Sequence, residues 1–535
     1  MPARRGSADR RYLPWLLPLL AVLVAVAALA ERGGATARAH GRNPHPARRA
    51  GTGRVSARSP RTVAAAVRRP AITVRATVLR TPGEPLPRSF LGLSFEYWDL
   101  PSFASHPAAL QRVFRLLRIQ GDGPVPLRIG GDSADQSFWG NSPAARLGPW
   151  PYHITDGWLR TLASVVRTGR LRVLLDLNLA QRSPAASARF ARQAVMRLPA
   201  GSLMGFEIGN EPDIYHHWVD YHLPGRSGLF AAPSGWDQYS PARYARAFSA
   251  YARALARVAP RVPLAGPETA YPQRDLAWER RLLSTDAGRV AIITVHRYPL
   301  SACARPSAGD YSTIARVLSP GIAAGLEPGI SPALALARRA GLPLRMTELN
   351  SVTCEGRRGV SNTFAAALWA PDALFSLWKA GLAGVNIHVR QGAANAAFWM
   401  SRAGLKPRPL LYGLALFARA VGSGGRLAHL RVGRSAPSIA LWAARHGQRL
   451  NVLVLDKGAS PARLVLRVPS ERPAVIERLS APSVHAATGV TLAGQTLGAS
   501  GRWLGRRSVE RVRRGPAGYR LDVPPYSGAL ISFGL

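Results

Sequence analysis

A repeated pattern between about residues 87 and 390 most constrains the fold. Short apolar runs alternate with longer stretches of helical spacing, such as Ala185–Arg197 and Pro241–Val258. Runs of this length, rich in Val, Leu and Ile, suit strands buried on both faces of a parallel sheet. The eight runs are Phe90–Phe95, Pro126–Ile129, Arg172–Leu177, Met204–Ile208, Pro263–Ala265, Ala291–Val295, Pro343–Met346 and Gly384–Ile387. Eight strand–helix repeats predict an α/β fold, a (β/α)8 TIM barrel over residues 85–420.

Polar side chains follow each of these apolar runs. A barrel brings the carboxyl ends of its strands to one face, so these side chains would converge on a single pocket. An open, doubly wound sheet would gather only those beside its switch point. In chain order they are Glu96, Asp132, Asn178, Asn210 with Glu211, Glu268, His296 with Tyr298, Glu348 with Asn350, and His388 with Gln391. Their common register favours one site over eight unrelated loop side chains.

Two glutamates stand out among these residues, because they follow the fourth and seventh runs, which face each other across a barrel mouth. Cleaving a glycosidic bond requires a protonated carboxyl group for the leaving oxygen and an ionised one at the anomeric carbon. The segment Gly209–Pro212 also places the Asn210 amide where it can bind a sugar hydroxyl. The pattern predicts a retaining glycosidase with Glu211 as general acid/base and Glu348 as nucleophile.

These motifs carry a family resemblance. Phe206–Pro212 with Thr347-Glu348 resembles the retaining glycosidases whose catalytic glutamates lie on strands four and seven. Within that group, the chain resembles glycoside hydrolase family seventy-nine, the β-glucuronidase and heparanase-like enzymes. Further matching segments are Leu91–Glu96, Leu127–Ser133, His296–Pro299 and Glu348–Ser351. The resemblance implies a β-glycoside of a polysaccharide or glycoconjugate as substrate, with Glu96, Asp132, Asn210 and Tyr298 contacting the sugar in the cleaved subsite.

The loop after Glu348 departs from that family. Uronate-cleaving relatives often carry an aromatic residue and a Gly-Gly pair there, whose backbone amides reach the sugar carboxylate. This chain has Thr353-Cys354-Glu355-Gly356 instead, so an acid replaces a glycine and the sugar stays open. Arg357 and Arg358 either pair with a carboxylate or are solvated loop charge.

The two cysteines of the chain, Cys303 and Cys354, lie in the loops after runs six and seven. Adjacent barrel strands would place these loops side by side, which predicts a disulfide at the rim. A buried pair of free thiols is the alternative. The cysteines lack a third and fourth metal ligand at suitable spacing. We therefore expect no metal and no cofactor, and we interpret the pair His216-His217 as loop surface.

The texture of the sequence changes after a predicted last barrel helix, Tyr412–Arg419. Short alternating stretches separated by Gly, Pro and Ser predict an antiparallel β-sandwich domain over residues 421–535. The stretches are Ile439–Trp442, Leu450–Leu455, Leu464–Val468, Val475–Leu479 and Ala529–Phe533. The strand-like Ile72–Leu79 has no place among eight repeats, so we predict that residues 71–84 join the sandwich, as in the resembled family.

The first 70 residues predict targeting rather than a folded domain. Four arginines precede an uncharged apolar run, Tyr12–Ala30, which predicts a signal peptide or an uncleaved membrane anchor over residues 1–30. Residues 31–70 are rich in arginine and predict a disordered linker, either a solvated tether or in contact with an anionic surface. These segments predict a secreted or extracytoplasmic protein, with membrane anchoring as one alternative.

The net charge of +42 has two interpretations. Of the 71 basic residues, 68 are arginine, which indicates GC-rich coding, and binding of a polyanion is the alternative. The chain has no nucleic-acid-binding motif, so we expect a carbohydrate partner and no nucleic acid. A transglycosidase using the same residues and a non-catalytic cell-wall-binding protein are the alternative functions. The paired glutamates favour the glycosidase, because a fold alone does not define a function.

Overall fold

The computed structural model describes residues 70–140, 152–215, 239–433 and 436–535. The predicted targeting segment, most of the predicted linker and the pair His216-His217 lie outside these ranges. The statements below concern the described residues.

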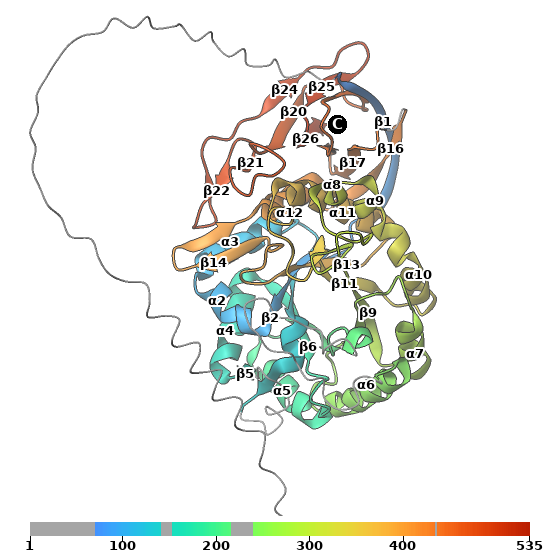
Figure 1. Ribbon diagram of the computed structural model, residues 1–535, viewed down its shortest axis with the longest axis vertical. Coiled ribbons are helices and arrows are strands. Elements are labelled where there is room, and N and C mark those ends of the chain that lie inside the picture. Colours follow the sequence, from blue (N-terminus) through green and yellow to red (C-terminus); the bar gives the residue numbers. More distant parts are fainter. Residues whose placement is uncertain (1–69, 141–151, 216–238, 434–435) are drawn as a thin grey trace, which may run out of the picture. The chain divides into compact units, whose positions relative to one another are not determined.

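Eight parallel strands close into a barrel, which confirms the predicted fold class (Figure 1). Parallel pairing of β13 with β2, with Val385 opposite Leu91, closes the ring. All six residues of β2, β3, β8 and β11 are buried, which explains their continuous apolar runs. In barrel order the strands are β2 (Leu91–Glu96), β3 (Val125–Gly130), β6 (Leu171–Leu177), β7 (Leu203–Ile208), β8 (Leu264–Thr269), β9 (Val290–Arg297), β11 (Leu344–Leu349) and β13 (Gly384–Val389).

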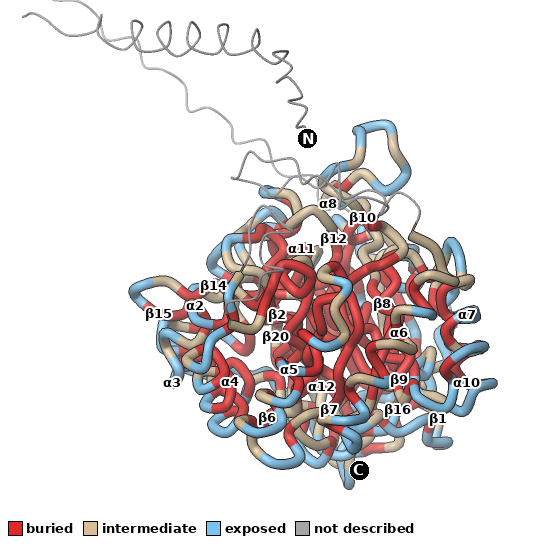
Figure 2. The backbone as a smooth tube through the Cα atoms, turned by 90° about the horizontal axis from the view of Figure 1, so that it is seen from below, coloured by how far each residue is buried: buried red, intermediate tan, exposed pale blue. Residues whose placement is uncertain are grey.

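Helices surround the strands, and the buried residues concentrate inside this ring (Figure 2). Polar side chains cap several of the helices: Thr155 accepts a hydrogen bond from the Trp158 amide at the start of α4, and Ser240 caps α6 before Pro241. The larger helices are α3 (Pro107–Leu117), α4 (Asp156–Gly169), α5 (Pro184–Arg197), α6 (Pro241–Ala256), α7 (Ala277–Asp286), α10 (Leu326–Arg339), α11 (Phe364–Ala380) and α12 (Pro409–Val421).

Short elements fill the loops between strands and helices. The short helices are η1 (Tyr97–Asp99), α2 (Leu100–Ala104), η2 (Gly131–Gln136), α8 (Ile314–Val317) and α9 (Pro320–Ala324). The small strand pairs are β4 (Ser137–Trp139) with β5 (Tyr152–Ile154), β10 (Leu300–Ser301) with β12 (Val352–Thr353), β14 (Phe398–Ser401) with β15 (Gly404–Pro407), and β22 (Thr496–Leu497) with β23 (Trp503–Leu504).

A second, mostly antiparallel sheet follows the barrel. Its strand order is β21-β20-β26-β18-β17-β16-β1-β19-β25, and β24 also pairs with β20. The strands are β1 (Ile72–Pro85), β16 (Arg426–Val432), β17 (Ile439–His446), β18 (Arg449–Asp456), β19 (Ala462–Arg467), β20 (Ala474–Ser480), β21 (Thr491–Leu492), β24 (Glu510–Val512), β25 (Tyr519–Val523) and β26 (Ser527–Gly534). The mostly antiparallel second domain agrees with the predicted fold class, and hydrogen bonds join all ten of its strands.

The sheet curls over a shared apolar core. The rings of Tyr519 on β25 and Phe533 on β26 have centroids 4.8 Å apart, although these strands lie far apart in the strand order. β1 lies between β16 and β19, and its pairing with β19 is parallel, with Ile72 opposite Ala462. Within the described residues, the chain therefore contributes β1 to this sheet, builds the barrel and returns to the sheet.

The sheet packs against α11 and α12 of the barrel (Figure 1). The rings of Phe375 on α11 and Trp442 on β17 stack with centroids 5.4 Å apart. The Trp442 Nε1 group donates to Asp372 Oδ1 at 2.8 Å, and Lys457 Nζ lies 2.7 Å from Asp372 Oδ2. A buried ion pair and stacked aromatic rings thus join the two domains.

The predicted location requires a correction. We expected a protein outside the cytoplasm with membrane anchoring as an alternative, but no described helix is long and apolar enough to cross a membrane. Crossing the hydrocarbon core takes about 20 apolar residues. The 17-residue α11 is the longest described helix, and it packs inside the protein. The apolar run that suggested the anchor lies outside the described residues.

Candidate active site

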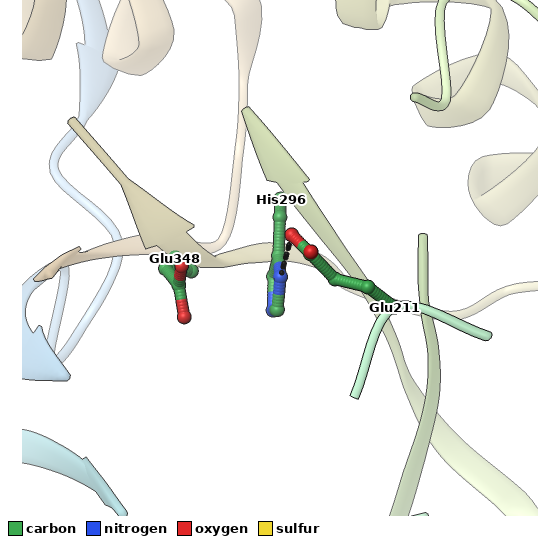
Figure 3. A group of neighbouring side chains, drawn as sticks. All are labelled: Glu211, His296 and Glu348. Carbon is green, nitrogen blue, oxygen red and sulfur yellow. Dashed lines mark hydrogen bonds and ion pairs between the residues drawn. The ribbon is translucent and has the colours of Figure 1, made fainter. Parts of the chain in front are cut away.

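The fold brings Glu211 and Glu348 together from opposite sides of the barrel mouth (Figure 3). Glu348 lies within β11, and Glu211 follows β7 in a tight turn with φ values of 81° at Gly209 and 48° at Glu211. A Cβ atom on Gly209 would lie 2.5 Å from Leu179, so the turn requires glycine. One carboxylate oxygen of each glutamate and one ring nitrogen of His296 all lie within 4.8 Å of one another.

Glu348 is held as a carboxylate. Arg128 Nη1 donates to its Oε2 at 2.8 Å, and the Tyr298 hydroxyl donates to its Oε1 at 2.5 Å. Burial raises the pKa of Glu348, but His388, His296, Arg128 and Tyr298 outweigh burial and lower it to about 2. His388 Nδ1 lies 3.6 Å from Oε1. Glu348 is therefore ionised at neutral pH.

Glu211 has the opposite electrostatic environment. Burial raises its pKa well above the ordinary value, and the negative charge of Glu348 raises it further. His296 Nδ1 lies 3.0 Å from Glu211 Oε1, and Figure 3 shows His296 between the two glutamates. Burial lowers the pKa of His296 to about 3, so this neighbour is neutral at pH 7 and carries the charge that helps to lower the pKa of Glu348 only in acid. Glu211 thus favours its protonated form while Glu348 is ionised.

Arg128 on β3 is the centre of the buried network beneath the mouth, a role that was not predicted from the sequence. Its guanidinium contacts the carboxylates of four residues, at 2.9, 2.8, 2.8 and 3.2 Å: Glu207, Glu268, Glu348 and Asp176. It also donates to Asn210 Oδ1 at 3.0 Å. The signal was an arginine inside an otherwise buried run, Leu127-Arg128-Ile129, since an unpaired charge is too costly there.

The four predicted sugar contacts lie around the mouth but differ in access. Tyr298 bridges Glu348 and His388, and its hydroxyl is 2.9 Å from His388 Nδ1. Asn210 is bound to Arg128, and Asp132 Oδ2 accepts from Arg390 Nη1 at 3.1 Å. Glu96 is fully buried, and it accepts from the Ser133 amide at 2.9 Å and faces His388 Nε2 at 3.3 Å. Glu96 therefore lies behind His388 and not on the open surface of the mouth.

The remaining strand-end residues have different positions. Glu268 joins the Arg128 network, whereas three amides hold loops. Asn178 donates to the Ser137 carbonyl at 3.1 Å, Asn350 to the His388 carbonyl at 3.1 Å, and Gln391 to the Met400 carbonyl at 2.5 Å. The common register therefore located the site, but it did not separate reacting groups from groups that fix the loops.

Asp135 and Asp213 position the Glu211 segment and were not predicted. Asp135 is buried, and its Oδ1 accepts from the amides of Leu179 and Ala180 at 2.9 and 3.1 Å. The hydroxyl of Tyr215, four residues after Glu211, donates to its Oδ2 at 2.6 Å. Asp213 accepts from the amides of Ala270 and Tyr271 at 2.9 and 3.0 Å. These contacts join residues far apart in the sequence, so no local motif predicts them.

The loop after Glu348 is fixed to its neighbour. Cys303 and Cys354 form the predicted disulfide, and β10 and β12 pair in parallel beside it. Glu355 Oε1 lies 3.2 Å from Arg390 Nε, so this acidic residue is paired. The Arg357 guanidinium contacts the Tyr311 ring face and donates to the Ala302 carbonyl at 3.2 Å. Arg357 is thus engaged within the protein.

Glu211, His296 and Glu348 also have donor atoms that could surround a cation. Arg128 already occupies Oε2 of Glu348, and the Tyr298 hydroxyl already occupies Oε1. A fixed positive charge 2.8 Å from a carboxylate oxygen repels a metal ion at that position. The arrangement therefore suits carboxyl chemistry, and we assign no metal to it.

Comparisons with known proteins agree with this architecture. No protein-family model matches the sequence. The chain is 24% identical over 531 residues to a β-glucuronidase from Aspergillus niger, covering 86% of this chain and 94% of that protein. Its structure is similar to a 4-O-α-L-rhamnosyl-β-D-glucuronidase from Fusarium oxysporum (TM-score 0.68, 17% identity, 86% of this chain, 100% of that one).

It is also similar to an α-L-arabinofuranosidase from Thermotoga maritima, with a TM-score of 0.60 and 14% identity over 86% of this chain and 100% of that one. At these identities, the solved structures show the fold: a TIM barrel joined to a mostly antiparallel sheet. The two solved structures share this fold although their names give different sugars. The sugar therefore has to be argued from this chain's own residues.

Proposed function

We propose that this chain is a glycoside hydrolase that cleaves O-glycosyl bonds with retention of configuration, through a covalent glycosyl-enzyme intermediate. One observation carries the proposal: two carboxyl groups face each other across the barrel mouth, and their pKa values are shifted in opposite directions. One carboxylate oxygen of Glu211 lies within 4.8 Å of one carboxylate oxygen of Glu348. This distance is close to the separation of about 5–5.5 Å between the two carboxyl groups of retaining enzymes. The β-glucuronidase relative supports the same class of reaction.

In the first step, the Glu348 carboxylate attacks the anomeric carbon. The bond from that carbon to the leaving oxygen breaks, and the leaving oxygen takes the proton of Glu211. The charge of Arg128 and the hydroxyl of Tyr298 keep Glu348 ionised before the attack. Loss of the negative charge on Glu348 as its ester forms then removes one cause of the raised pKa of Glu211.

In the second step, Glu211 acts as a base. Its carboxylate takes a proton from water while the water oxygen bonds to the anomeric carbon, and the bond to Glu348 breaks. Glu348 leaves as a carboxylate beside Arg128, and Glu211 is protonated again. Two inversions at the anomeric carbon return the sugar with its original configuration.

For the sugar, we propose a β-glycoside of a polysaccharide or glycoconjugate, β-glucuronidase-like in type. The relative's activity makes β-glucuronides the first class to test. Glu355 would oppose a uronate carboxylate, whereas Arg390, held between Glu355 and Asp132, would attract it. A panel of aryl β-glucuronide, β-glucoside, β-galactoside and β-xyloside decides between these influences.

The mechanism is tested on the nucleophile. Glu348→Ala should abolish turnover of an activated aryl glycoside while the far-UV circular dichroism stays unchanged. Azide added to Glu348→Gly should restore release of the aryl group and give a glycosyl azide of inverted configuration. Retained turnover in Glu348→Ala would refute the assignment of the nucleophile.

A further inference from the structure

A pocket outside the barrel mouth lies between α3 and the hairpin β22–β23, and Figure 1 shows these elements side by side. Its volume is about 570 Å³. The helix contributes Arg112, Arg115 and Leu116, and the hairpin contributes Gly501, Arg502 and Trp503. Because α3 belongs to the barrel and the hairpin lies in the segment between β21 and β24 of the second domain, the pocket is formed by the contact between the two domains.

The hairpin is fixed against the helix. Gly501 has a φ of 74°, and a Cβ atom there would lie 3.2 Å from both the Ala109 carbonyl oxygen and Arg112 Cβ. Arg112 Nη1 donates to the Ser500 carbonyl at 2.7 Å, and the Ala499 carbonyl accepts from the Leu405 amide at 2.8 Å. The pocket is thus preorganised, which lowers the entropic cost of binding a ligand.

The charge of the pocket is one-sided. It holds three guanidinium groups and no carboxylate among its lining residues. Within the described ranges, Arg112, Arg115 and Arg502 form no ion pair with an acidic residue. Arginines of the second sheet do form such pairs, for example Arg478 on β20 with Glu510 at 2.8 Å. The pocket therefore offers uncompensated positive charge, and guanidinium groups match the geometry of a carboxylate.

The pocket also has an aromatic lining residue, Trp503, which follows Arg502 in the hairpin. Trp503 is half-buried, and its ring is held by Arg419, whose Cζ lies 4.9 Å from the ring centroid. The Tyr412 ring contacts it edge-on, with centroids 5.9 Å apart. A fixed indole provides an apolar surface on which the C–H face of a sugar ring can pack.

We propose that this pocket is a second carbohydrate-binding site, which takes an acidic sugar residue. The sugar carboxylate lies among Arg112, Arg115 and Arg502, and the ring packs on Trp503. The inference rests on the proposed function, because it takes the ligand to be a uronate-containing glycan of the kind that a β-glucuronidase-like enzyme would cleave. A polymer bound here is held by the enzyme at a point separate from the reacting bond, which raises its effective concentration at the mouth.

The test uses a hexasaccharide of alternating β-glucuronate and N-acetylglucosamine, with titration calorimetry on the full chain carrying Glu348→Gln to prevent turnover. Adding Arg115→Gln with Arg502→Gln should remove one binding site per chain, or weaken it at least about tenfold. Both arginines are exposed, so the fold should be unaffected. Trp503→Ala should weaken the same site, and Trp503→Phe should restore part of the binding.

The matched control is Arg467→Gln with Arg520→Gln, which removes the same charge from exposed positions of β19 and β25. Equal weakening by both pairs would overturn the proposal, because it would reduce binding to general charge attraction. Absence of hexasaccharide binding, or full displacement by an equal concentration of inorganic phosphate, would also overturn it.

The two proposals can fail separately. Hydrolysis of an aryl glycoside should stay within twofold in both double variants on the native background, because the pocket lies outside the mouth. Normal hydrolysis with no change in hexasaccharide binding would refute the pocket alone. A pocket-dependent binding site in a chain that hydrolyses no aryl glycoside would refute the proposed reaction alone.

Discussion

Two arginines are buried inside the barrel strands, and their surroundings differ. Arg128 on β3 lies within 3.2 Å of four carboxylates. Arg345 on β11 forms no ion pair with a carboxylate of the described residues, and it donates to the Asn386 side chain at 2.8 Å and to the carbonyls of Ser89 and Phe90 at 2.9 and 3.3 Å. Each guanidinium lies against a glycine, Gly130 or Gly384, where a Cβ atom would collide with it.

The difference distinguishes a charge with a structural role, Arg345, from a charge that acts on the proposed nucleophile, Arg128. Burial lowers the pKa of Arg345 to about 9, because carbonyl dipoles replace water only in part. Burial also acts on Arg128, but its carboxylate neighbours reverse the effect and raise the pKa above the ordinary value. Arg345 donates its hydrogen bonds to neighbouring residues of the barrel wall. Arg128 places its charge beside Glu348, where the proposed reaction needs an ionised oxygen.

The largest effect should come from Arg128→Met. This change leaves the ionised Glu348 without its buried partner, and breaking such a pair costs about 3–5 kcal/mol of stability. Turnover of an aryl glycoside should also fall at least about a thousandfold, because the electrostatic support of the nucleophile is lost. Urea unfolding and steady-state kinetics measure the two losses. A nearly native kcat/KM in Arg128→Met would contradict the proposal that Arg128, unlike Arg345, supports the nucleophile.

The pH profile should show the low pKa of Glu348, which His388, His296 and Arg128 depress together. Glu348 has a depressed pKa of about 2, so its ionised form is present above that value and is lost as the pH falls through it. We therefore expect kcat/KM to stay level between about pH 3 and 5 and to fall on the alkaline side, as Glu211 loses its proton. An acid limb near the ordinary glutamate pKa of about 4.3 would contradict this expectation.

Arg345→Met should have an intermediate effect confined to stability. It leaves the Ser89 carbonyl and the Asn386 amide oxygen without this donor, and each unsatisfied buried group costs about 1–3 kcal/mol. The Phe90 carbonyl still accepts from the Val385 amide at 2.7 Å. The remaining enzyme should keep kcat/KM within a few-fold and should show the same acid limb. A shift of that limb would mean that Arg345 also acts on the reacting groups.

The smallest effect should come from Glu268→Gln. Burial raises the pKa of Glu268 well above its ordinary value, which favours its protonated form, and a glutamine oxygen can still accept from Arg128. The free energy of unfolding should change by less than about 1 kcal/mol at pH 7. Glu348→Gln is the contrast, because it leaves the charge of Arg128 without its ionised partner. Similar losses in the two variants would show that Glu268 is also ionised.

The sequence predicted the parts of the fold that depend on local composition. Strands buried on both faces produce uninterrupted apolar runs, so all eight barrel strands were located. β16 and β25 were missed: the burial of β16 does not alternate strictly, and β25 is only five residues long with two charged exposed positions. The parallel pairing of β1 with β19 depends on strands nearly the whole chain apart, and local composition carries no signal for it.

For the candidate site, the sequence located the glutamate pair but not what tunes it. Glu211 and Glu348 stand at strand ends, a position that a repeat makes visible. Arg128 and Arg390 act across the barrel on residues from other strands, so their partners appear only once the ring is closed. The burial of Glu96 behind His388 could not be predicted either, because a position at a strand end does not determine which way the side chain faces.

The place of β1 has a consequence for how the protein is made. A ribosome releases β1 long before it reaches β16 and β19, the strands on either side of it in the sheet. At about 5–20 residues per second, the stretch from Pro85 to Ala462 takes on the order of 20 to 75 s. During that time the nascent chain carries an unpaired strand while the barrel is being completed. The barrel and the sheet therefore cannot fold as two independent domains. A chain truncated after α12 would keep β1 as an unpaired strand, which is prone to aggregation.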